Sequence, residues 1–150
     1  MKRTLSIAAI IGALLIGGCS AGATAGTAVT PETMAGTWQV VSGEGPNGSI
    51  DPKYAPITLV VAEDGSYTGN TGCNNYTGAF SIDGENLSTT PVGVTTMECA
   101  SDDADVVTSM SETEVLYLDA LEQTESGTAS AKEMRLDGVG THITYKKVGE

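Results

Sequence analysis

The stretch Thr68–Gly78 constrains the fold of this chain more than any other part of its sequence. It contains Cys73 and three glycines, Gly69, Gly72 and Gly78. Glycine is required where the backbone takes a positive φ angle or passes close to another segment of the chain. Apolar, strand-like runs flank the stretch on both sides. We therefore expect a small domain that is folded around a tight turn at this point.

The N-terminus has the pattern of an export signal. Lys2 and Arg3 precede an apolar run over Leu5–Leu15, and the run is shorter than the about 20 residues that a membrane-spanning helix needs. A basic start, a short apolar segment and small residues before the cleavage point are typical of a secretory signal peptide. The sequence predicts that residues 1–18 form such a peptide and are removed.

Cys19 indicates that the exported chain carries a lipid. The residues before it, Ile16, Gly17 and Gly18, resemble a bacterial lipobox, in which the cysteine thiol receives a diacylglycerol with fatty-acyl chains such as palmitate. The alternative is an ordinary signal peptide with an incidental cysteine. Because two or more acyl chains hold a protein stably on a membrane, we expect a lipid-anchored protein of the bacterial cell envelope. Its domain would face the extracytoplasmic side.

Residues 19–34 are predicted to be a lipidated, flexible tether. From Ser20 to Met34 nearly every side chain is small or polar, and the segment has no hydrophobic period. Such a composition is typical of a spacer. The folded domain is accordingly predicted over residues 35–150.

The mature chain is strongly acidic. Without Lys2 and Arg3, it holds five Lys and Arg residues against 19 Asp and Glu residues, a net charge of −14. Such a surface repels nucleic acid, so we expect no nucleic-acid partner. Binding of a cation is an alternative role, for which Asp102, Asp103 and Asp105 are weak candidate metal ligands. They lack the spacing of an EF-hand loop, and acids at the start of a helix are the simpler interpretation.

Alternating apolar side chains predict a mostly antiparallel sheet. Ile57–Val61 is the strongest strand because it is rich in β-branched residues, and Tyr67 is expected to be half-buried on the next one. The predicted strands are Thr37–Ser42, Ile57–Val61, Ser66–Thr71, Ala79–Ile82, Asn86–Thr90, Val92–Met97, Glu133–Leu136 and Thr141–Val148. Between them, Gly43–Pro56 is predicted as a long connection, Glu125–Ala131 as a loop, and Asp83-Gly84 as the central pair of a type I′ turn.

One amphipathic helix interrupts the strands. The apolar period from Asp105 to Glu122 is about 3.6 residues, after a helix start at Ser101-Asp102-Asp103. Glu114 intrudes near the edge of the apolar stripe, whose members are Val106, Met110, Tyr117 and Leu121. The predicted fold class is α+β: a strongly curved, barrel-like antiparallel sheet with one amphipathic helix packed on it.

These features together resemble the META domain, also called the HslJ-like lipoprotein family. The matching residues are Gly36-Thr37-Trp38, Ile57–Val61, Gly72-Cys73-Asn74 with Tyr76 and Gly78, Thr95-Thr96-Met97 with Cys99, Glu114–Leu121 and Leu136-Asp137-Gly138. The resemblance covers about Met34 to Val148. It implies an envelope or secreted protein, often lipid-anchored and in some members linked to stress, with no general catalytic activity attached to the fold. We expect no cofactor.

Cys73 and Cys99 are the two cysteines of the mature domain, and disulfides form and persist in exported proteins. We expect a structural disulfide between them. Free thiols or a redox dithiol are the alternatives, although the chain has no Cys-x-x-Cys motif. The disulfide would make a rigid polar loop, the candidate binding surface, of Asn74, Asn75, Tyr76 and Thr77. In the simpler interpretation, Asn74 and Asn75 only satisfy backbone groups of a tight turn.

Signals for catalysis are weak. Nucleophilic catalysis usually needs a base, and the single histidine, His142, is expected on the outward face of the last strand. We therefore predict a monomeric, non-enzymatic domain that binds an envelope partner or supports the envelope under stress. The alternatives are an inhibitor of an exported protease, a cation-binding module and an enzyme of a type that the sequence does not disclose.

Overall fold

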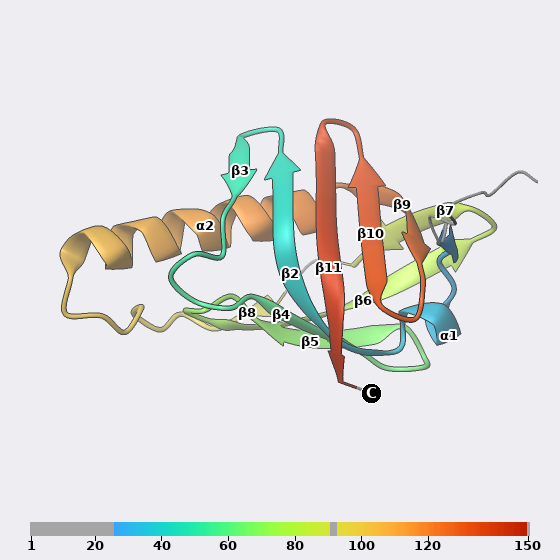
Figure 1. Ribbon diagram of the computed structural model, residues 1–150, viewed down its shortest axis with the longest axis horizontal. Coiled ribbons are helices and arrows are strands. Elements are labelled where there is room, and N and C mark those ends of the chain that lie inside the picture. Colours follow the sequence, from blue (N-terminus) through green and yellow to red (C-terminus); the bar gives the residue numbers. More distant parts are fainter. Residues whose placement is uncertain (1–25, 91–92, 150) are drawn as a thin grey trace, which may run out of the picture.

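The computed structural model describes residues 26–90 and 93–149. The predicted signal peptide, Cys19 and the first part of the tether lie outside these residues. Antiparallel strands form one sheet in the order β1-β9-β10-β11-β2-β4-β5-β6-β7, with β3 beside β2 and β8 beside β6 (Figure 1). The bounds are β1 Thr27–Ala28, β2 Gly36–Gly45, β3 Gly48–Ile50, β4 Thr58–Val61, β5 Ser66–Asn70, β6 Asn75–Asp83, β7 Asn86–Thr89, β8 Gly93–Val94, β9 Thr124–Ala129, β10 Glu133–Gly138 and β11 Thr141–Gly149.

The sheet curls on itself. Strands β7 and β9 stand near opposite ends of the strand order, yet they contact each other. Helix α2 (Ala104–Glu122) contacts β2, β3, β11 and β7 and so runs along the curl (Figure 1). The predicted α+β class is confirmed, with a curled sheet that is not closed into a barrel. Among the described residues, no helix has the length and apolar character to cross a membrane.

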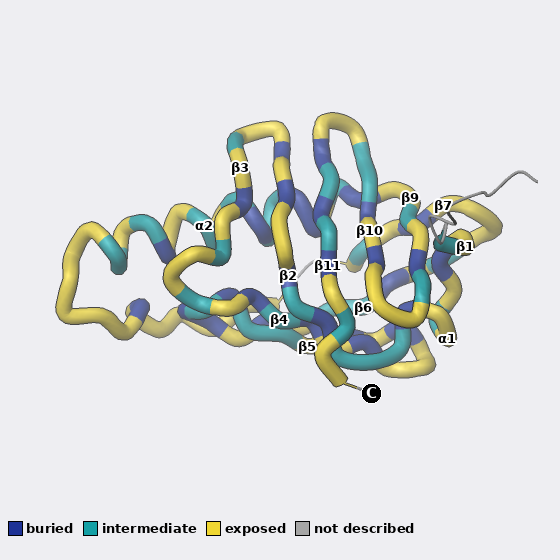
Figure 2. The backbone as a smooth tube through the Cα atoms, in the orientation of Figure 1, coloured by how far each residue is buried: buried dark blue, intermediate teal, exposed yellow. Residues whose placement is uncertain are grey.

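The core lies inside the curl and is rich in aromatic side chains. Trp38, Tyr76, Tyr117 and Tyr145 are all fully buried, and side chains of this size each bury roughly 150–250 Å². Figure 2 shows the resulting alternation of buried and exposed positions along the strands. Trp38 also donates its indole N–H to the carbonyl of Met34 at 2.7 Å. The strand prediction around Trp38 is confirmed, because the alternation there reflects real burial.

The predicted tether is wrong for the residues just before β2. Strand β1 pairs with β9, and a short helix, α1 (Pro31–Met34), follows a capping box at Thr30. Val29 and Met34 are buried in the core at 4% and 0% exposure. Only these two apolar side chains anchor the segment, which is too few to produce a period in the sequence. The folded domain therefore begins before residue 35.

The long connection predicted over Gly43–Pro56 is wrong in its first half. Strand β2 continues through Gly45 and turns directly into β3. The glycines here allow close packing: a Cβ on Gly43 would lie 2.9 Å from the Ile50 side chain, and one on Gly45 would lie 3.2 Å from the Ala120 side chain. A glycine-rich strand packed against a helix has the composition of a loop, which explains the error.

Glu125–Ala131 is also not a loop, because most of it belongs to β9. This strand pairs with β10 on one side and with β1 on the other, so its backbone groups are satisfied despite its polar sequence.

At the hairpin after β6, Asp83 pairs with Asn86. The turn residues are thus Gly84 and Glu85, and only Gly84 has a positive φ, +64°. A type I′ turn on Asp83-Gly84 is excluded, since it needs positive φ at both central residues.

The remaining differences are local. Strand β5 ends at Asn70 rather than Thr71, and Tyr67 is 2% exposed instead of half-buried. Of the extended segment predicted over Val92–Met97, only β8 is a strand, and Val92 lies outside the described residues. The helix prediction is confirmed: α2 begins after its N-cap, Asp103.

Candidate functional site

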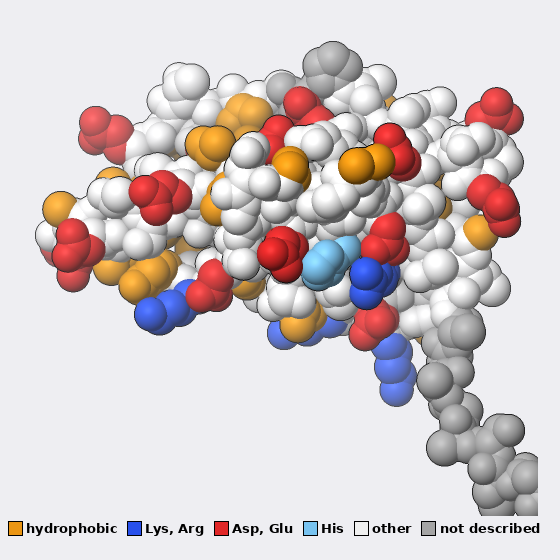
Figure 3. Space-filling model, turned by 90° about the horizontal axis from the view of Figure 1, so that it is seen from above, with side chains coloured by type: hydrophobic (Ala, Val, Ile, Leu, Met, Phe, Trp, Pro, Cys, Tyr) orange, Lys and Arg blue, Asp and Glu red, His pale blue; other side chains and the backbone are white. Residues whose placement is uncertain are grey.

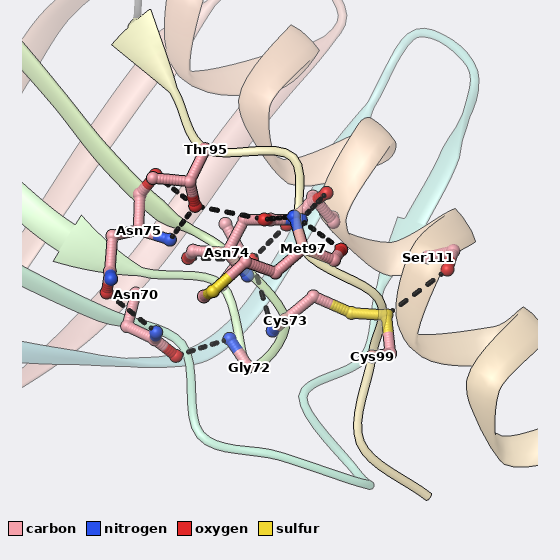
Figure 4. The surroundings of a disulfide bond; sticks show 11 residues. Asn70, Gly72, Cys73, Asn74, Asn75, Thr95, Met97, Cys99 and Ser111 are labelled. Carbon is pink, nitrogen blue, oxygen red and sulfur yellow. Dashed lines mark hydrogen bonds between the residues drawn. A yellow bond between two sulfur atoms is a disulfide. The ribbon is translucent and has the colours of Figure 1, made fainter.

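Cys73 and Cys99 are joined by a disulfide, the pairing that the sequence predicts. Their Cα atoms are 4.5 Å apart, and both residues are buried. Cys73 lies in the turn between β5 and β6, and Cys99 lies in the segment that leads from β8 to α2 (Figure 4). The Ser111 hydroxyl of α2 lies 3.2 Å from the Cys99 sulfur. The disulfide thus holds this irregular segment between the sheet and the helix.

The turn that carries Cys73 is closed by local hydrogen bonds. The Thr71 hydroxyl accepts the backbone N–H of Asn74 at 2.9 Å, and Thr71 N–H donates to the Asn74 carbonyl at 2.9 Å. Gly72 has a φ of +92°, and a Cβ there would lie 2.6 Å from the side chain of Ala55. Glycine is therefore required at this position for two reasons, its conformation and its close contact.

Asn74 is buried, at 5% exposure, and its side chain holds the backbone of Met97. Its Oδ1 accepts Met97 N–H at 2.6 Å, and its Nδ2 donates to the Met97 carbonyl at 3.3 Å. The amide thereby pairs with both backbone groups of one residue, as a neighbouring strand would. Oδ1 also accepts the Thr95 hydroxyl at 3.0 Å. These five groups satisfy one another, so Asn74 holds the backbone of this segment in place inside the fold.

Glu114 of α2 completes this network. Its Oε1 accepts the second N–H of the Asn74 amide at 2.9 Å, and its Oε2 accepts the Thr71 hydroxyl. A carboxylate that accepts two hydrogen bonds in a partly buried position links the helix to the turn. The sequence contained a signal for this contact, because Glu114 lies near the edge of the apolar stripe of the helix. Its partners could not be identified from the sequence alone.

The predicted binding loop at Asn74–Thr77 is not a loop. Asn75, Tyr76 and Thr77 are the first residues of β6, which pairs with β5 on one side and with β8 on the other. Tyr76 is fully buried, whereas Asn75 and Thr77 are exposed on the outer face of the sheet. The prediction of a loop is wrong. These residues alternate between exposed and buried positions as a strand does, and their Asn- and Gly-rich composition is typical of a turn instead.

Tyrosine hydroxyls form a chain through the core next to this turn. The Tyr76 hydroxyl donates to the Thr58 carbonyl at 2.7 Å and lies 2.6 Å from the Tyr117 hydroxyl, which in turn lies 3.3 Å from the Tyr145 hydroxyl. Burial raises the pKa of all three tyrosines well above its ordinary value. They are therefore neutral at pH 7 and serve as hydrogen-bonding core residues.

A groove lies beside the disulfide, between the segment that holds Cys99 and helix α2. Residues that line it include Met97, Glu98, Cys99, Val107, Ser111 and Glu114. Met97 is 55% exposed, and together with Val107 it gives the groove apolar as well as polar walls. Glu98 adds a carboxylate. The groove can therefore contact an apolar group through Met97 and, at the same time, a hydrogen-bond donor or a cation through Glu98.

The other candidate residues do not join this site. Asp103 caps α2, because its carboxylate accepts the N–H groups of Asp105 and Val106. Asp102 lies next to it and is exposed. In the two described ranges, no group of three or more His, Cys, Asp or Glu residues is placed to hold a metal ion. His142 lies on β11, opposite Glu44 of β2 and Asp137 of β10, away from the disulfide.

Comparison with known proteins gives a family and a fold. The family model of the META domain matches residues 31–148. An NMR structure of a protein from Burkholderia xenovorans is similar at 21% sequence identity and a TM-score of 0.60, covering 89% of this chain and 99% of that one. A second NMR structure has 20% identity and a TM-score of 0.55, with 79% and 95% covered. The comparison with curated proteins gives no match.

Proposed function

This chain belongs to the META domain family, and from that premise we propose that it is a lipid-anchored binding domain on the extracytoplasmic side of the bacterial cell envelope. The buried disulfide Cys73–Cys99 is the observation that carries the proposal. Disulfides persist in oxidising compartments outside the cytoplasm and are rare inside it. The lipobox-like sequence ending at Cys19 provides the anchor, and the proposed role is binding, including under envelope stress, without catalysis.

The groove beside the disulfide is the proposed binding surface. Its walls are held by the disulfide, by the pairing of Asn74 with Met97 and by the contact of Cys99 with Ser111. A surface that is ordered before binding loses less conformational entropy when a partner arrives. Met97 and Glu98 favour a protein segment that presents an apolar side chain next to a basic one.

The alternatives have less support from the geometry. A protease inhibitor needs a protruding loop, but Tyr76 and Thr77 are paired on both sides within the sheet, and Asn75 is paired with β5. A cation-binding module needs converging carboxylates, but that of Asp103 accepts backbone hydrogen bonds of α2. An enzyme could use Glu98 and Glu114, which both line the groove, but both oxygens of Glu114 accept hydrogen bonds from Asn74 and Thr71.

The intact mass of the protein, extracted from its own membrane fraction, tests the anchor and the compartment. We expect an N-terminus at diacylglyceryl-modified Cys19 and a mass two hydrogen atoms below that of the reduced chain. The matched variant Cys19→Ala should lack the lipid and retain the disulfide. A soluble wild-type product that is cut elsewhere, or two free thiols at Cys73 and Cys99, would contradict the proposal.

Site-specific crosslinking tests the groove. A photoreactive amino acid at Met97 should give a discrete adduct with an envelope protein in intact cells. The same amino acid at Val139, which is 78% exposed in the turn between β10 and β11, is the control and should give none. Equal adducts at both positions, or adducts at Val139 alone, would show that the groove is not the binding surface.

A further inference from the structure

The segment from β8 to the disulfide is exposed along its whole length. We call residues 93–98 the edge segment; every one of them is exposed, whereas Cys99, which follows, is buried. The sequence of the edge segment is Gly-Val-Thr-Thr-Met-Glu, in which valine and threonine favour extended structure. It contains no lysine or proline, the residues that often protect the exposed edge of a sheet from pairing with other chains.

The backbone of the edge segment is bound on one side. Val94 stands opposite Tyr76 of β6, and the N–H of Thr95 donates to the Asn75 carbonyl at 3.0 Å. In an antiparallel pair, successive residues point their backbone groups alternately toward the partner strand and away from it. Because Thr95 points toward β6, the N–H and C=O of Val94 point away from it, toward the free edge.

Asn74 extends this alternation past the end of β8. Its side chain accepts the N–H of Met97 at 2.6 Å and donates to the Met97 carbonyl at 3.3 Å, so Met97 points inward (Figure 4). The residues on either side of it, Thr96 and Glu98, therefore point their backbone groups outward. Among the described residues, neither of their N–H groups has a hydrogen-bond partner. Free backbone groups thus recur at every second residue of the edge segment.

We propose that the edge segment binds an extended peptide segment of a partner protein as an added β-strand. A second strand offers N–H and C=O groups at the same repeat, about 6.8 Å for every second residue, and main-chain hydrogen bonds supply the affinity in this mode of recognition. A helix, whose backbone groups are bound internally, a lipid or a glycan does not offer this repeat. The inference rests on the function proposed above and adds the class of partner and the way in which it binds.

The charge of the molecule indicates which peptide fits. Glu98 ends the edge segment, and Glu114 lines the groove beside it. Figure 3 shows acidic side chains spread over the face that it draws, and the mature chain has a net charge of −14. An acidic peptide, or a second copy of this chain, would be repelled. The expected partner segment is therefore basic, with an apolar side chain that reaches Met97.

Exchange of amide protons with water tests the backbone pairing. It is measured on the full mature protein in detergent, as saturation transfer from the water signal in NMR, and the probe is a capped octapeptide of alternating valine and lysine. Without peptide, we expect transfer at Val94, Thr96 and Glu98 but not at Thr95 and Met97, whose N–H groups are already bound. A peptide concentration of ten times its Kd should lower the transfer at the three free groups about ten-fold.

Two control peptides separate backbone pairing from the attraction of charges. The same octapeptide with every backbone nitrogen methylated keeps its side chains and charge but has no N–H donor. It should bind at least about ten-fold more weakly, because two or more hydrogen bonds are lost. An octapeptide of alternating valine and glutamate keeps the backbone donors and reverses the charge, and it should not bind at the same concentration.

Two variants at one position make the test specific to the free edge. Thr96→Pro removes an outward N–H and should weaken binding of the valine–lysine peptide at least about five-fold, the effect of one lost hydrogen bond. Thr96→Ala keeps this N–H, is the matched control, and should bind as the wild type does. Thermal unfolding shows whether both variants are folded. If Thr96→Pro is not, the pattern of transfer in the wild type decides the test.

Four results would overturn the proposal. They are equal transfer at Thr95 and Thr96 without peptide, no binding of the valine–lysine peptide, binding that leaves the transfer at Thr96 unchanged, and equal affinity for the methylated peptide. Loss of the transfer at Thr96 when the protein alone is concentrated would also do so, because a second copy would then be the occupant. A peptide that shifts the signals of Met97 and Val107 but leaves the transfer at Thr96 unchanged would remove the added strand and keep the groove. Crosslinking at Met97 tests the groove separately.

Discussion

The side-chain amide of Asn74 donates to the carboxylate of Glu114 at 2.9 Å while it also binds both backbone groups of Met97. One buried side chain thus connects the start of β6, the segment before α2 and α2 itself. The disulfide between Cys73 and Cys99 joins the turn before β6 to the same segment, one residue before Asn74 and two residues after Met97. The segment is held by two independent connections, one covalent and one made of hydrogen bonds.

Replacing Asn74 should cost much of the stability of the domain. Asn74→Leu keeps the branching and the number of heavy atoms of the side chain but leaves the N–H of Met97 and Oε1 of Glu114 without the Asn74 amide. Because each unsatisfied buried group costs about 1–3 kcal/mol, we expect the free energy of unfolding to fall by roughly 2–4 kcal/mol in urea titrations. Asn75→Leu, next in sequence but exposed, should change it by less than about 0.5 kcal/mol. Equal losses would show that Asn74 does not have this role.

Removing the disulfide should loosen the segment before α2 more than the sheet. The two cysteines are 26 residues apart, and loop entropy then predicts a loss of about 3.5 kcal/mol for the double variant Cys73→Ser, Cys99→Ser. Hydrogen exchange should speed up most at residues 95–103. Their exchange should stay slower than that of an unfolded chain, because Asn74 still binds Met97. The loss of global stability also speeds exchange in β2 and β11, so a speed-up at residues 95–103 that is no larger than theirs would contradict a local role for the disulfide.

The sequence predicts which strands and helices bury apolar side chains better than it predicts which distant residues contact one another. The strand at Ile57–Val61 and the helix that ends at Glu122 could be predicted because their apolar residues recur at the regular spacing of one buried face. Strand β9 and the N-terminal segment at Val29 were missed because few apolar residues anchor them and pairing through the backbone does the rest. The contact of Asn74 with Glu114 joins residues 40 positions apart. No pattern among neighbouring residues in the sequence indicates a contact over such a separation.

Two glycines in β5 and β6 should not tolerate a side chain. Gly69 stands opposite Tyr76, and Gly78 stands opposite Tyr67; a Cβ on either glycine would overlap the facing ring. We expect Gly69→Ala to destabilise the domain by more than about 3 kcal/mol, since the ring and the backbone of Thr58 both resist displacement. The control is Gly84→Ala, where no atom lies within 4 Å and only the positive φ is unfavourable.

That control should cost about 1–2 kcal/mol, and thermal unfolding compares the two variants. A smaller loss at Gly69 than at Gly84 would mean that Tyr76 moves away easily and that the chain of tyrosine hydroxyls is not rigid.

The stability of the domain should fall in alkaline solution because of its buried tyrosines. Burial, with a smaller contribution from Glu122, raises the pKa of Tyr67 to about 12, and burial raises those of Tyr76, Tyr117 and Tyr145. A tyrosine whose pKa is higher in the folded state is fully stabilising below its unfolded pKa of about 10. Its contribution is lost as the pH rises from there through the folded pKa. Urea titrations at pH 7, 9 and 11 should show a constant free energy of unfolding between the first two and a clear fall at the third.

Tyr67 separates this effect from general alkaline damage. Its hydroxyl is buried and, within the described residues, has no hydrogen-bond partner, so Tyr67→Phe removes a group that costs free energy to bury. We expect this variant to be at least as stable as the wild type at pH 7 and to lose less stability between pH 9 and 11. Tyr117→Phe removes a hydroxyl that lies 2.6 Å from that of Tyr76 and should be less stable at pH 7. If Tyr67→Phe were less stable at pH 7 than Tyr117→Phe, the Tyr67 hydroxyl of the wild type would have to form a hydrogen bond inside the core.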